Sequence, residues 1–409
     1  MPSVNLKQAI AAADSGMWSI VVDCLQTLSL QELDRNETVL DLALQVLIQG
    51  DIEQQWDIAK IIPKLGEIAI QPLLEIVNDR DLDLEDRWFG ARILGAFKQP
   101  QVVTALVALI QQNEDPELTT IASGALTKIG IPAIATMTDL LATPDRGIAI
   151  AILAQIRHSQ TIEPLIQVID DPDPQLRTLI VEALGSFHDP RIPPRLLLKL
   201  TDVAASVRQA TVVALSLRGD LAVELDLLEH LKPRLFDLNL DVCKSTALGL
   251  ARLPDPEVVG TLAEVLASIN TPNELKSSVI LALGWIGTQP AIDSLIAALE
   301  NRSIDLAPEI VTAIGKTERE RVYASQRLVA YLNEKELYKG HPAIVKQEIA
   351  AALGNLGNIN TVTDLVRLLK DPDDRVKLHV MTAISKLTSI VTVEMLPKKP
   401  EFPPDCGNQ

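Results

Sequence analysis

Residues 161–190 read TIEPLIQVIDDPDPQLRTLIVEALGSFHDP, and this stretch decides the fold. Its apolar residues recur at helical spacing on both sides of an Asp-Asp-Pro-Asp-Pro break. Ile162–Ile169 predicts a first helix, with Pro164 in the first turn, where its missing N–H does no harm. Gln175–Phe187 predicts a second helix, which the carboxylates of the break can cap. The stretch therefore predicts a helix–turn–helix unit.

The same unit recurs along nearly the whole chain. Each copy closes its second helical run on an aliphatic residue followed by a small one, and we use the aliphatic residue as the marker of its repeat. Successive markers lie about 32 residues apart on average, and such a fixed period is the signature of a repeat architecture. The markers are Ile62, Leu94, Leu126, Leu153, Leu184, Leu215, Leu248, Leu283, Ile314, Leu353 and Ile384.

The residues four places before the markers indicate which side of each second helix is buried. From Leu94 onward they are apolar or small except at Thr211 and Lys244, as a buried face at helical spacing requires. One helix pair cannot cover such a face alone, so each pair must be stabilised by stacking on its neighbours. The sequence thus predicts an all-α solenoid of about eleven helix pairs.

A basic residue stands seven places before the marker in most units. A cation at the start of a helix opposes the helix dipole, so it requires a compensating partner. We expect the Asp-rich turn of the same or the adjoining unit to supply it, in a structural ladder that ties the units together. A linear row of anion-binding sites is the alternative. The ladder residues are Arg87, Arg146, Arg177, Arg208, Lys276, Lys346 and Lys377, and the exceptions are Gln55, Thr119, Asp241 and Ala307.

The composition excludes several classes of protein. Hydrophobic residues make up 47% of the chain and aromatic residues only 3%, so aliphatic side chains supply the apolar mass, which favours packed helices over disorder. The net charge of −17 repels phosphate backbones, so nucleic acid is not an expected partner. No apolar run approaches the roughly 18 residues of a spanning helix, so no membrane insertion is expected.

The cysteines and the N-terminal residues predict a cytoplasmic protein. Cys24, Cys243 and Cys406 are too few and too scattered for a secreted disulfide scaffold. The first residues, MPSVNLKQAIAAADSG, contain no apolar run flanked by basic residues, so we expect no signal peptide.

Several of these features together resemble HEAT repeats. They are the helix pair, the Asp-Pro-Asp turn, the ladder residue and the Ala-Leu-Gly ending, and they most resemble the short HEAT-like repeats of the phycobilisome lyase group of cyanobacteria. Residues 87–95, RWFGARILG, are similar to that group's Arg-aromatic-aromatic helices that end in Leu-Gly. The resemblance covers about residues 37–390 and implies a right-handed α-α superhelix, a HEAT-like solenoid. It does not imply one activity, because the class spans bilin lyases, phycobilisome-degradation adaptors and assembly scaffolds.

The ends of the chain fit the repeat less well. Residues 1–36 contain two short helical patterns, Val4–Ala13 and Met17–Leu28, which predict an N-terminal helical cap. Residues 37–390 form the predicted solenoid, with a polar insertion at 333–341, and residues 391–409 a Pro-rich, flexible tail that carries Cys406. Insertions in repeat proteins often serve binding, but a merely tolerated loop is the other interpretation.

The exposed side of the second helices offers candidate partner-binding residues. The positions six and two before the marker, and two after it, project away from the buried face, and most of them are small or polar. Contiguous exposed apolar residues usually mark a contact; the alternative is that tighter winding buries some of them, or that the helical register is off by one. The candidates are Trp88 and Arg92 near the N-terminal end, and Val213, Leu217, Val242, Leu250, Leu281 and Trp285 across three adjacent units.

The sequence nominates no catalytic, cofactor-binding or metal-binding residue. The five histidines show no His-Glu pairing, no Cys-x-x-Cys occurs, and no phosphate-binding Gly-x-x-x-x-Gly-Lys is present. We therefore expect a non-catalytic scaffold or adaptor, and the resemblance implies a phycobiliprotein as the class of partner. One alternative is a subunit of a bilin lyase, with phycocyanobilin in the groove. An assembly partner of a metallocluster carrier is a third possibility, which rests on the breadth of the family alone.

Overall fold

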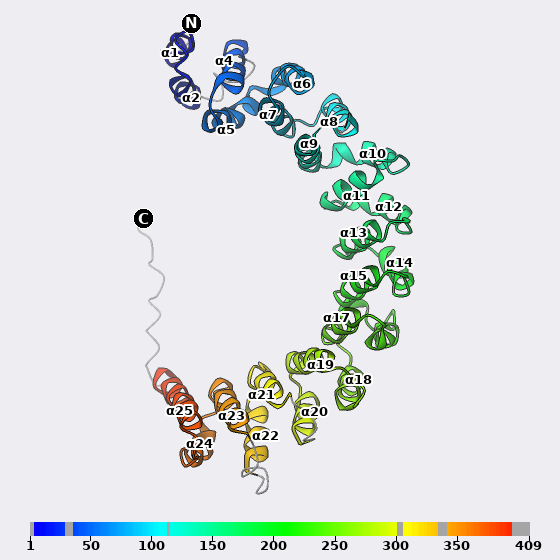
Figure 1. Ribbon diagram of the computed structural model, residues 1–409, viewed down its shortest axis with the longest axis vertical. Helices are drawn as coiled ribbons and strands as arrows, with labels where there is room; N and C mark the ends of the chain where they lie inside the picture. Colours follow the sequence, from blue (N-terminus) through cyan, green and yellow to red (C-terminus); the bar gives the residue numbers. More distant parts are fainter. Residues whose placement is uncertain (1–3, 29–35, 113–114, 301–305, 334–341, 395–409) are drawn as a thin grey trace, which may run out of the picture. The chain divides into compact units, whose positions relative to one another are not determined.

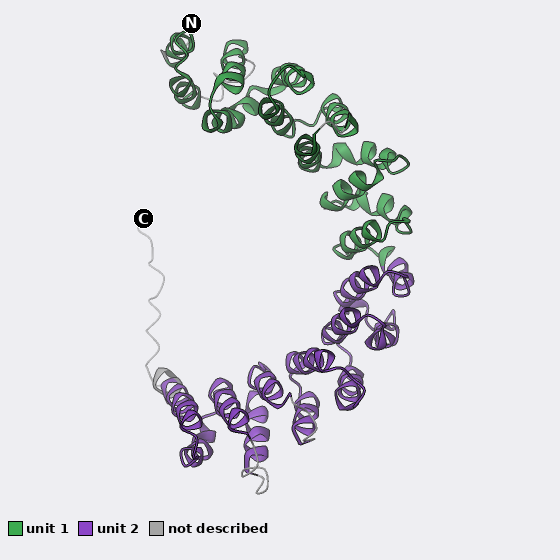
Figure 2. Ribbon diagram, viewed as in Figure 1, with its two compact units in different colours: residues 1–192 green, residues 193–409 purple. Residues whose placement is uncertain are grey.

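The chain is built from helices in two compact units. A computed structural model describes all residues except 1–3, 29–35, 113–114, 301–305, 334–341 and 395–409. Every regular element within the described part is an α-helix or a 3₁₀ helix, which confirms the all-α prediction. Residues 1–192 form unit 1 and residues 193–409 form unit 2 (Figure 2).

In unit 1 the helices from α4 onward follow one another in pairs (Figure 1). The α-helices are α1 (Val4–Ala13), α2 (Trp18–Gln26), α4 (Glu37–Gln49), α5 (Ile52–Ile61), α6 (Ile70–Asn78), α7 (Leu84–Leu94), α8 (Pro100–Gln112), α9 (Pro116–Ile129), α10 (Ile131–Leu140), α11 (Arg146–Gln155), α12 (Ile162–Gln167) and α13 (Pro174–Gly185). The 3₁₀ helices are η1 (Ile62–Ala69) and η2 (Ser159–Thr161).

Unit 2 continues the same alternation. Its α-helices are α14 (Ile192–Lys199), α15 (Ala205–Ser216), α16 (Leu227–Leu231), α17 (Leu240–Leu250), α18 (Glu257–Ala267), α19 (Asn273–Ile286), α20 (Gln289–Glu300), α21 (Ala307–Gly315), α22 (Arg321–Asn333), α23 (Ala343–Leu356), α24 (Val362–Leu368) and α25 (Asp374–Glu394). The 3₁₀ helices are η3 (Gly219–Leu221), η4 (Lys232–Phe236) and η5 (Ile359–Thr361).

First and second helices form two layers in each unit. The even-numbered helices from α4 are the first helices of the pairs, and the odd-numbered helices from α5 are the second helices. In unit 1, α7, α9, α11 and α13 pack side by side (Figure 1). In unit 2 the odd-numbered helices from α15 to α25 pack side by side in the same way. The core therefore runs between the layers and from pair to pair, as expected for helix pairs that cannot cover their apolar faces alone.

Small residues beside the marker explain how closely the second helices approach. At four repeats the glycine that follows the marker faces the alanine that precedes the marker of the next repeat; these glycines are Gly95, Gly284, Gly315 and Gly354. A Cβ atom on Gly284 would lie 3.1 Å from the Cβ of Ala313, and one on Gly354 would lie 3.0 Å from the Cβ of Ala383. Interiors are close-packed, so a larger side chain at either glycine would push the helices apart. The Ala-Leu-Gly ending thus specifies an inter-repeat contact.

The turns within the pairs repeat one hydrogen-bond pattern. The Asp171 carboxylate accepts a hydrogen bond from the Asp173 N–H at 2.8 Å, and the Asp237 carboxylate accepts one from the Asn239 N–H at 2.9 Å. Such Asx turns reverse the chain by a local side-chain contact. Asp173 then accepts a hydrogen bond from the Gln175 N–H at 2.8 Å and so caps α13. The acidic turn residues thus both end one helix and begin the next.

The two ends of the repeat array show how the predicted segments lie in the structure. The two helical patterns predicted near the N-terminus correspond to α1 and α2, which pack against each other, and α2 also packs against α4 and α5. At the other end, α25 runs to Glu394, so the predicted boundary after residue 390 falls inside a helix.

Two predicted segments lie outside the described residues. The polar insertion separates α22 from α23, but only its first residue, Asn333, belongs to a described helix. The predicted tail is not described from residue 395 onward, and Cys406 falls within that part.

Candidate functional site

The apolar residues predicted on three consecutive second helices are only partly exposed. Val213 and Leu217 of α15 are 42% and 53% exposed. Leu281 and Trp285 of α19 are 40% and 53% exposed. These four side chains therefore lie on the surface of the second-helix layer, where the sequence predicts them.

The two candidates on α17 are buried, so the prediction that they line an exposed surface is wrong. Val242 and Leu250 have no exposed surface. The reason is the register of the helix: the fully buried residue at the marker position is Leu250, two places after Leu248. Gly249 confirms this register, because a Cβ on it would collide with the Ser216 hydroxyl of α15. The Ala-Leu-Gly sequence of α17 therefore ends one residue before the buried marker position, instead of one residue after it.

The corrected register also changes the ladder position of α17. Seven residues before Leu250 stands Cys243, whose thiol donates to the Asp237 carbonyl oxygen at 3.2 Å. In α15 the guanidinium of Arg208 donates to the corresponding Asp202 carbonyl oxygen at 2.8 Å. A buried thiol thus stands where most repeats carry a cation.

The correction brings another leucine into the candidate surface. Leu248 is half-buried and occupies a stripe position of α17, between α15 and α19. Lys244, which pairs with Asp241 at 2.7 Å, lies on the same face of α17, and the exposed Arg252 lies just after the end of the helix. We call the resulting surface the apolar stripe, and its residues are Val213, Leu217, Leu248, Leu281 and Trp285.

Several ladder residues reach the aspartate of the next repeat's turn. Arg146 Nε donates to Asp171 Oδ2 at 2.8 Å, and Lys346 Nζ lies 2.7 Å from Asp371 Oδ2. Arg208 binds both carboxylate oxygens of Asp237, at 2.8 and 2.6 Å. Bidentate charge-assisted bonds of this kind are among the strongest in proteins. These pairs link adjacent repeats through residues that are 25 or 29 positions apart in the sequence.

Other ladder residues bond within their own repeat. Arg177 Nη1 donates to the carbonyl oxygens of Asp171 and Pro172, at 2.8 and 3.0 Å, and Arg87 Nε donates to that of Val77 at 3.0 Å. Each therefore satisfies carbonyl groups where the first helix ends and the chain turns. Lys377 pairs with Asp374 of its own helix at 2.8 Å, and Lys276 is buried.

The Arg208–Asp237 pair predicts a pH dependence of stability. The hydrogen bond from Arg208 lowers the pKa of Asp237 below its ordinary 3.8, although burial opposes it. A lowered folded-state pKa stabilises the protein above the unfolded pKa, so this contribution should be complete above about pH 5 and be lost as the pH falls below about 4. Urea unfolding measured between pH 7 and pH 3 should show that acidification lowers the free energy of unfolding less for Asp237→Asn than for the wild type. Parallel pH curves would contradict the assignment.

The turns of unit 2 expose apolar residues that sequence analysis missed. Val203, Leu238 and Ile269 follow the first residue of three consecutive turns, and each is at least 87% exposed. The equivalent position of other turns holds Pro172 or Pro372. A pocket of about 360 Å³ lies beside two of these turns, with Phe236, Leu238 and Pro272 in its lining. A search of the turns for apolar residues in the second position would have found Val203, Leu238 and Ile269.

An aromatic cluster surrounds Trp88 and Arg92 in unit 1. The ring centroids of Trp88 and Phe89 lie 5.1 Å apart, and Trp56 of α5 lies 5.9 Å from Trp88, in edge-to-face geometry. The Arg92 guanidinium lies 4.2 Å from the centroid of the Trp56 ring. The structure thus brings the two predicted residues together and adds Trp56. Its stripe position, six places before Ile62, is the sequence signal that could have found it.

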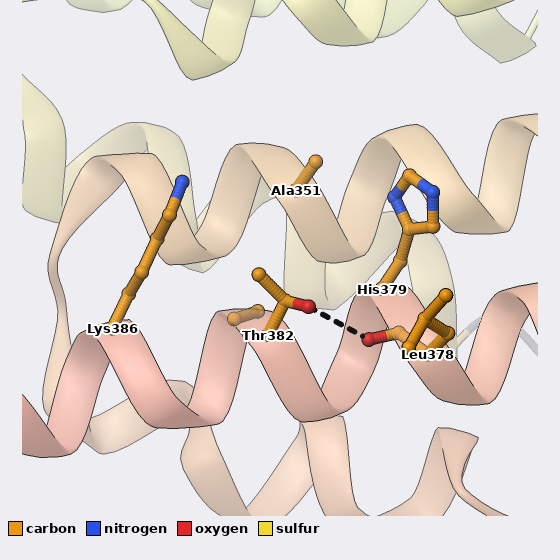
Figure 3. A pocket seen from close by; sticks show the side chains of 6 residues that line it. Ala351, Leu378, His379, Thr382 and Lys386 are labelled. Carbon is orange, nitrogen blue, oxygen red and sulfur yellow. Dashed lines mark hydrogen bonds between the residues drawn. The ribbon is translucent and has the colours of Figure 1, made fainter.

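A small pocket on the last two second helices carries little chemistry. It measures about 160 Å³ and is lined by Ala351 of α23 and by His379, Thr382 and Lys386 of α25, among others (Figure 3). The Thr382 hydroxyl donates to the Leu378 carbonyl oxygen at 3.0 Å, a bond within α25. No carboxylate lines the pocket, so His379 has no lining partner that could orient it as a general base.

The described residues form no evident reaction centre. Within that part of the chain, no group of three or more His, Cys, Asp or Glu side chains converges as a metal ion would require. Burial raises the pKa of the Cys24 and Cys243 thiols, which makes both weak nucleophiles at neutral pH. None of the described helices combines the length and apolar character needed to span a bilayer.

Two family models match parts of the repeat array. Residues 145–216, which include α13 and α15, match the model described as HEAT repeats. Residues 275–301, which include most of α19 and α20, match the PBS lyase HEAT-like repeat. These two segments are HEAT repeats, and the helix pairs of the array have the fold of a HEAT solenoid. The antiparallel pairs and their Ala-Leu-Gly contacts are therefore HEAT repeat packing.

Solved structures of the same architecture resemble the chain in fold. One is the Kap95:Nup1 complex, with 13% identity, a TM-score of 0.51, and coverage of 91% of this chain and 60% of the matched chain. Another is the crystal structure of Kap121p bound to Nup53p, with 15% identity, a TM-score of 0.50, and coverage of 92% and 52%. This chain spans little more than half the length of those proteins. At such identities the likeness shows the HEAT fold alone. No curated protein sequence matches the chain.

Proposed function

We propose that this HEAT-repeat protein is a non-catalytic adaptor that binds a protein partner through the apolar stripe. The observation that carries the proposal is the exposure of Leu217, Leu281 and Trp285 on second helices that lie near one another in unit 2. Contiguous exposed apolar side chains usually mark a contact surface. Trp is also the residue most enriched among those that dominate binding energy. The proposed function requires no bound cofactor.

We further propose that the partner is a phycobiliprotein in the cytoplasm, and that the adaptor acts in phycobilisome assembly or turnover. The match of residues 275–301 to the PBS lyase HEAT-like repeat supports this class of partner. The matched segment contains both stripe residues of α19, Leu281 and Trp285. Apolar side chains flanked by Arg252 and Lys244 suit a partner surface that combines apolar and acidic groups.

Replacing Trp285 with alanine should weaken binding of a purified phycobiliprotein by about thirtyfold, or about 2 kcal/mol. The side chain is half exposed, so the melting temperature and helix content should change little. Fluorescence anisotropy with the labelled partner measures the affinity, and circular dichroism checks the fold. Val322→Ala on the first helix α22 is the control, because Val322 is equally exposed but lies in the other layer. A variant that melts much earlier, or one that binds as well as the wild type, would refute the role of the stripe.

The bilin lyase interpretation is separated by a second assay. The purified protein is mixed with phycocyanobilin and a phycobiliprotein apo-subunit, and zinc-induced fluorescence reports covalent attachment. An adaptor should leave the attachment at its uncatalysed rate. Faster attachment in the presence of this chain would establish the lyase subunit instead.

A further inference from the structure

The Trp56–Trp88–Arg92 cluster of unit 1 packs against the buried ring of Phe89. Phe89 is almost completely buried, and its ring lies 5.5 Å from that of Trp56 and 5.1 Å from that of Trp88. Edge-to-face contacts of this kind add to the burial of the rings. The two tryptophans are therefore positioned by the core, while Trp56 remains 37% exposed and Trp88 is half-buried.

Arg92 lies over this platform, and its guanidinium donates no hydrogen bond to another described residue. Its guanidinium carbon lies 4.2 Å from the Trp56 centroid and 5.5 Å from the Trp88 centroid. Stacking uses the face of the guanidinium, and the N–H groups along its edge can still form a bidentate pair with a carboxylate. Arg92 is exposed, and among the described residues no carboxylate lies within ion-pair distance of it. This guanidinium is thus positioned by the two rings and has no acidic partner in the part of the chain that the structure describes.

The stripe positions around the cluster hold lysines and no acidic residue, although the chain as a whole is acidic. The stripe positions of α5 and α9 contribute the exposed side chains of Lys60 and Lys128. Lys60 pairs with Asp57 at 2.7 Å, and no acidic residue occupies a stripe position of α5, α7 or α9. In α13 the same positions hold Thr178, Glu182 and Ser186, with neither a cation nor an aromatic ring. Within unit 1, the cations and aromatic rings at stripe positions therefore lie on α5, α7 and α9 and not on α13.

We propose that this cluster is a binding site for an acidic polypeptide segment, separate in sequence from the apolar stripe of unit 2. A carboxylate of the segment pairs with Arg92, and an adjoining apolar side chain packs against Trp56 and Trp88. Charge complementarity argues for this occupant, because the cluster is a cationic surface with apolar walls. A nucleic acid is a less favourable occupant of this site, because the chain's net charge of −17 repels a phosphate backbone.

A short fluorescent peptide that alternates glutamate and leucine is the probe. It should bind the full chain, bind more weakly as salt is raised, and quench tryptophan fluorescence. Arg92→Gln should weaken binding about tenfold or more, because the charged bidentate contact is lost. Arg92→Lys should also weaken it, since lysine keeps the charge but loses the stacked fork. Arg157→Gln is the matched control, because Arg157 is an exposed arginine of the same unit without a ring contact among the described residues.

Several results would overturn the proposal. They are equal binding of a peptide with glutamine in place of glutamate, equal weakening by Arg157→Gln, and unchanged binding by Arg92→Gln. Tight binding of a single-stranded DNA oligomer that depends on Arg92 would identify a nucleic acid site instead. Trp285→Ala should bind the glutamate–leucine peptide like the wild type, so a failure here is distinguishable from a failure of the apolar stripe.

Discussion

Leu184→Ala should lower the free energy of unfolding by about 2–5 kcal/mol. Leu184 is the marker residue of the most regular repeat and has no exposed surface. Its removal leaves a cavity where α13 packs against its neighbours in unit 1, and close-packed helices cannot collapse fully around it. Urea unfolding followed by circular dichroism measures the loss.

Neighbouring repeats share interfaces, so the damage should extend beyond α13. Hydrogen exchange should accelerate in α11 as well as in α13, because each repeat is stabilised by the next. Leu198→Ala is the matched control, since Leu198 is 68% exposed and its truncation should cost less than about 0.5 kcal/mol. An unchanged unfolding midpoint for Leu184→Ala would show that the repeat register is wrong.

Asp237→Ala should destabilise the chain by about 3–5 kcal/mol, because it leaves a buried guanidinium without its counter-charge. The side chains of Arg208 and Asp237 are only 12% and 3% exposed. The substitution also removes the acceptor of the Asn239 N–H, and with it the turn that precedes α17. Denaturant unfolding of the single variants and of the double Arg208→Ala, Asp237→Ala variant gives the coupling energy.

The double variant should lose less than the sum of the single losses, since each single change strands the other partner. Asp241→Ala, in the first turn of α17 and close in sequence to Asp237, is the control. Its ion pair with Lys244 is exposed, and such pairs contribute about 1 kcal/mol or less. Additive losses at Arg208 and Asp237 would contradict a direct ladder contact.

The sequence predicts the repeat well because one physical constraint sets it. Marker residues such as Leu184 and Leu283 must face the neighbouring pair, and the small residues beside them must allow close approach, so the period is visible in the sequence. The all-α HEAT fold follows from this period. The acidic turn of residues 170–174 is likewise local, because Asp173 caps the next helix through its own side chain.

The sequence predicts α17 poorly because tertiary contacts, and not the local word, fix its register. The segment before α17 contains η3, the short helix α16 and η4. After it, α17 is oriented so that Leu250 lies at the inter-repeat contact and Leu248 is half-exposed. Counting six places back and two places forward from Leu248 of Ala-Leu-Gly therefore misplaces Val242 and Leu250. The burial of Val242 and Leu250 and the close contact between Gly249 and Ser216 reveal the correct face.

The candidate partner-binding residues illustrate the same limit. Trp285 and Leu217 are predicted correctly as exposed because their helices keep the common register. The contact of Trp56 with Arg92 joins two repeats, so no single helical wheel contains it. Exposed turn residues such as Leu238 escape an analysis that follows helix faces alone.

Hydrogen exchange of the chain alone and in complex with a purified phycobiliprotein tests the central claim most directly. The adaptor account predicts slower exchange on binding in α15, α17 and α19 of unit 2, and no such protection in a Trp285→Ala chain at the same concentrations. Backbone amides of the first helices α18 and α20 should exchange as before. Protection confined to other helices, or no complex at all with the phycobiliprotein, would contradict the account.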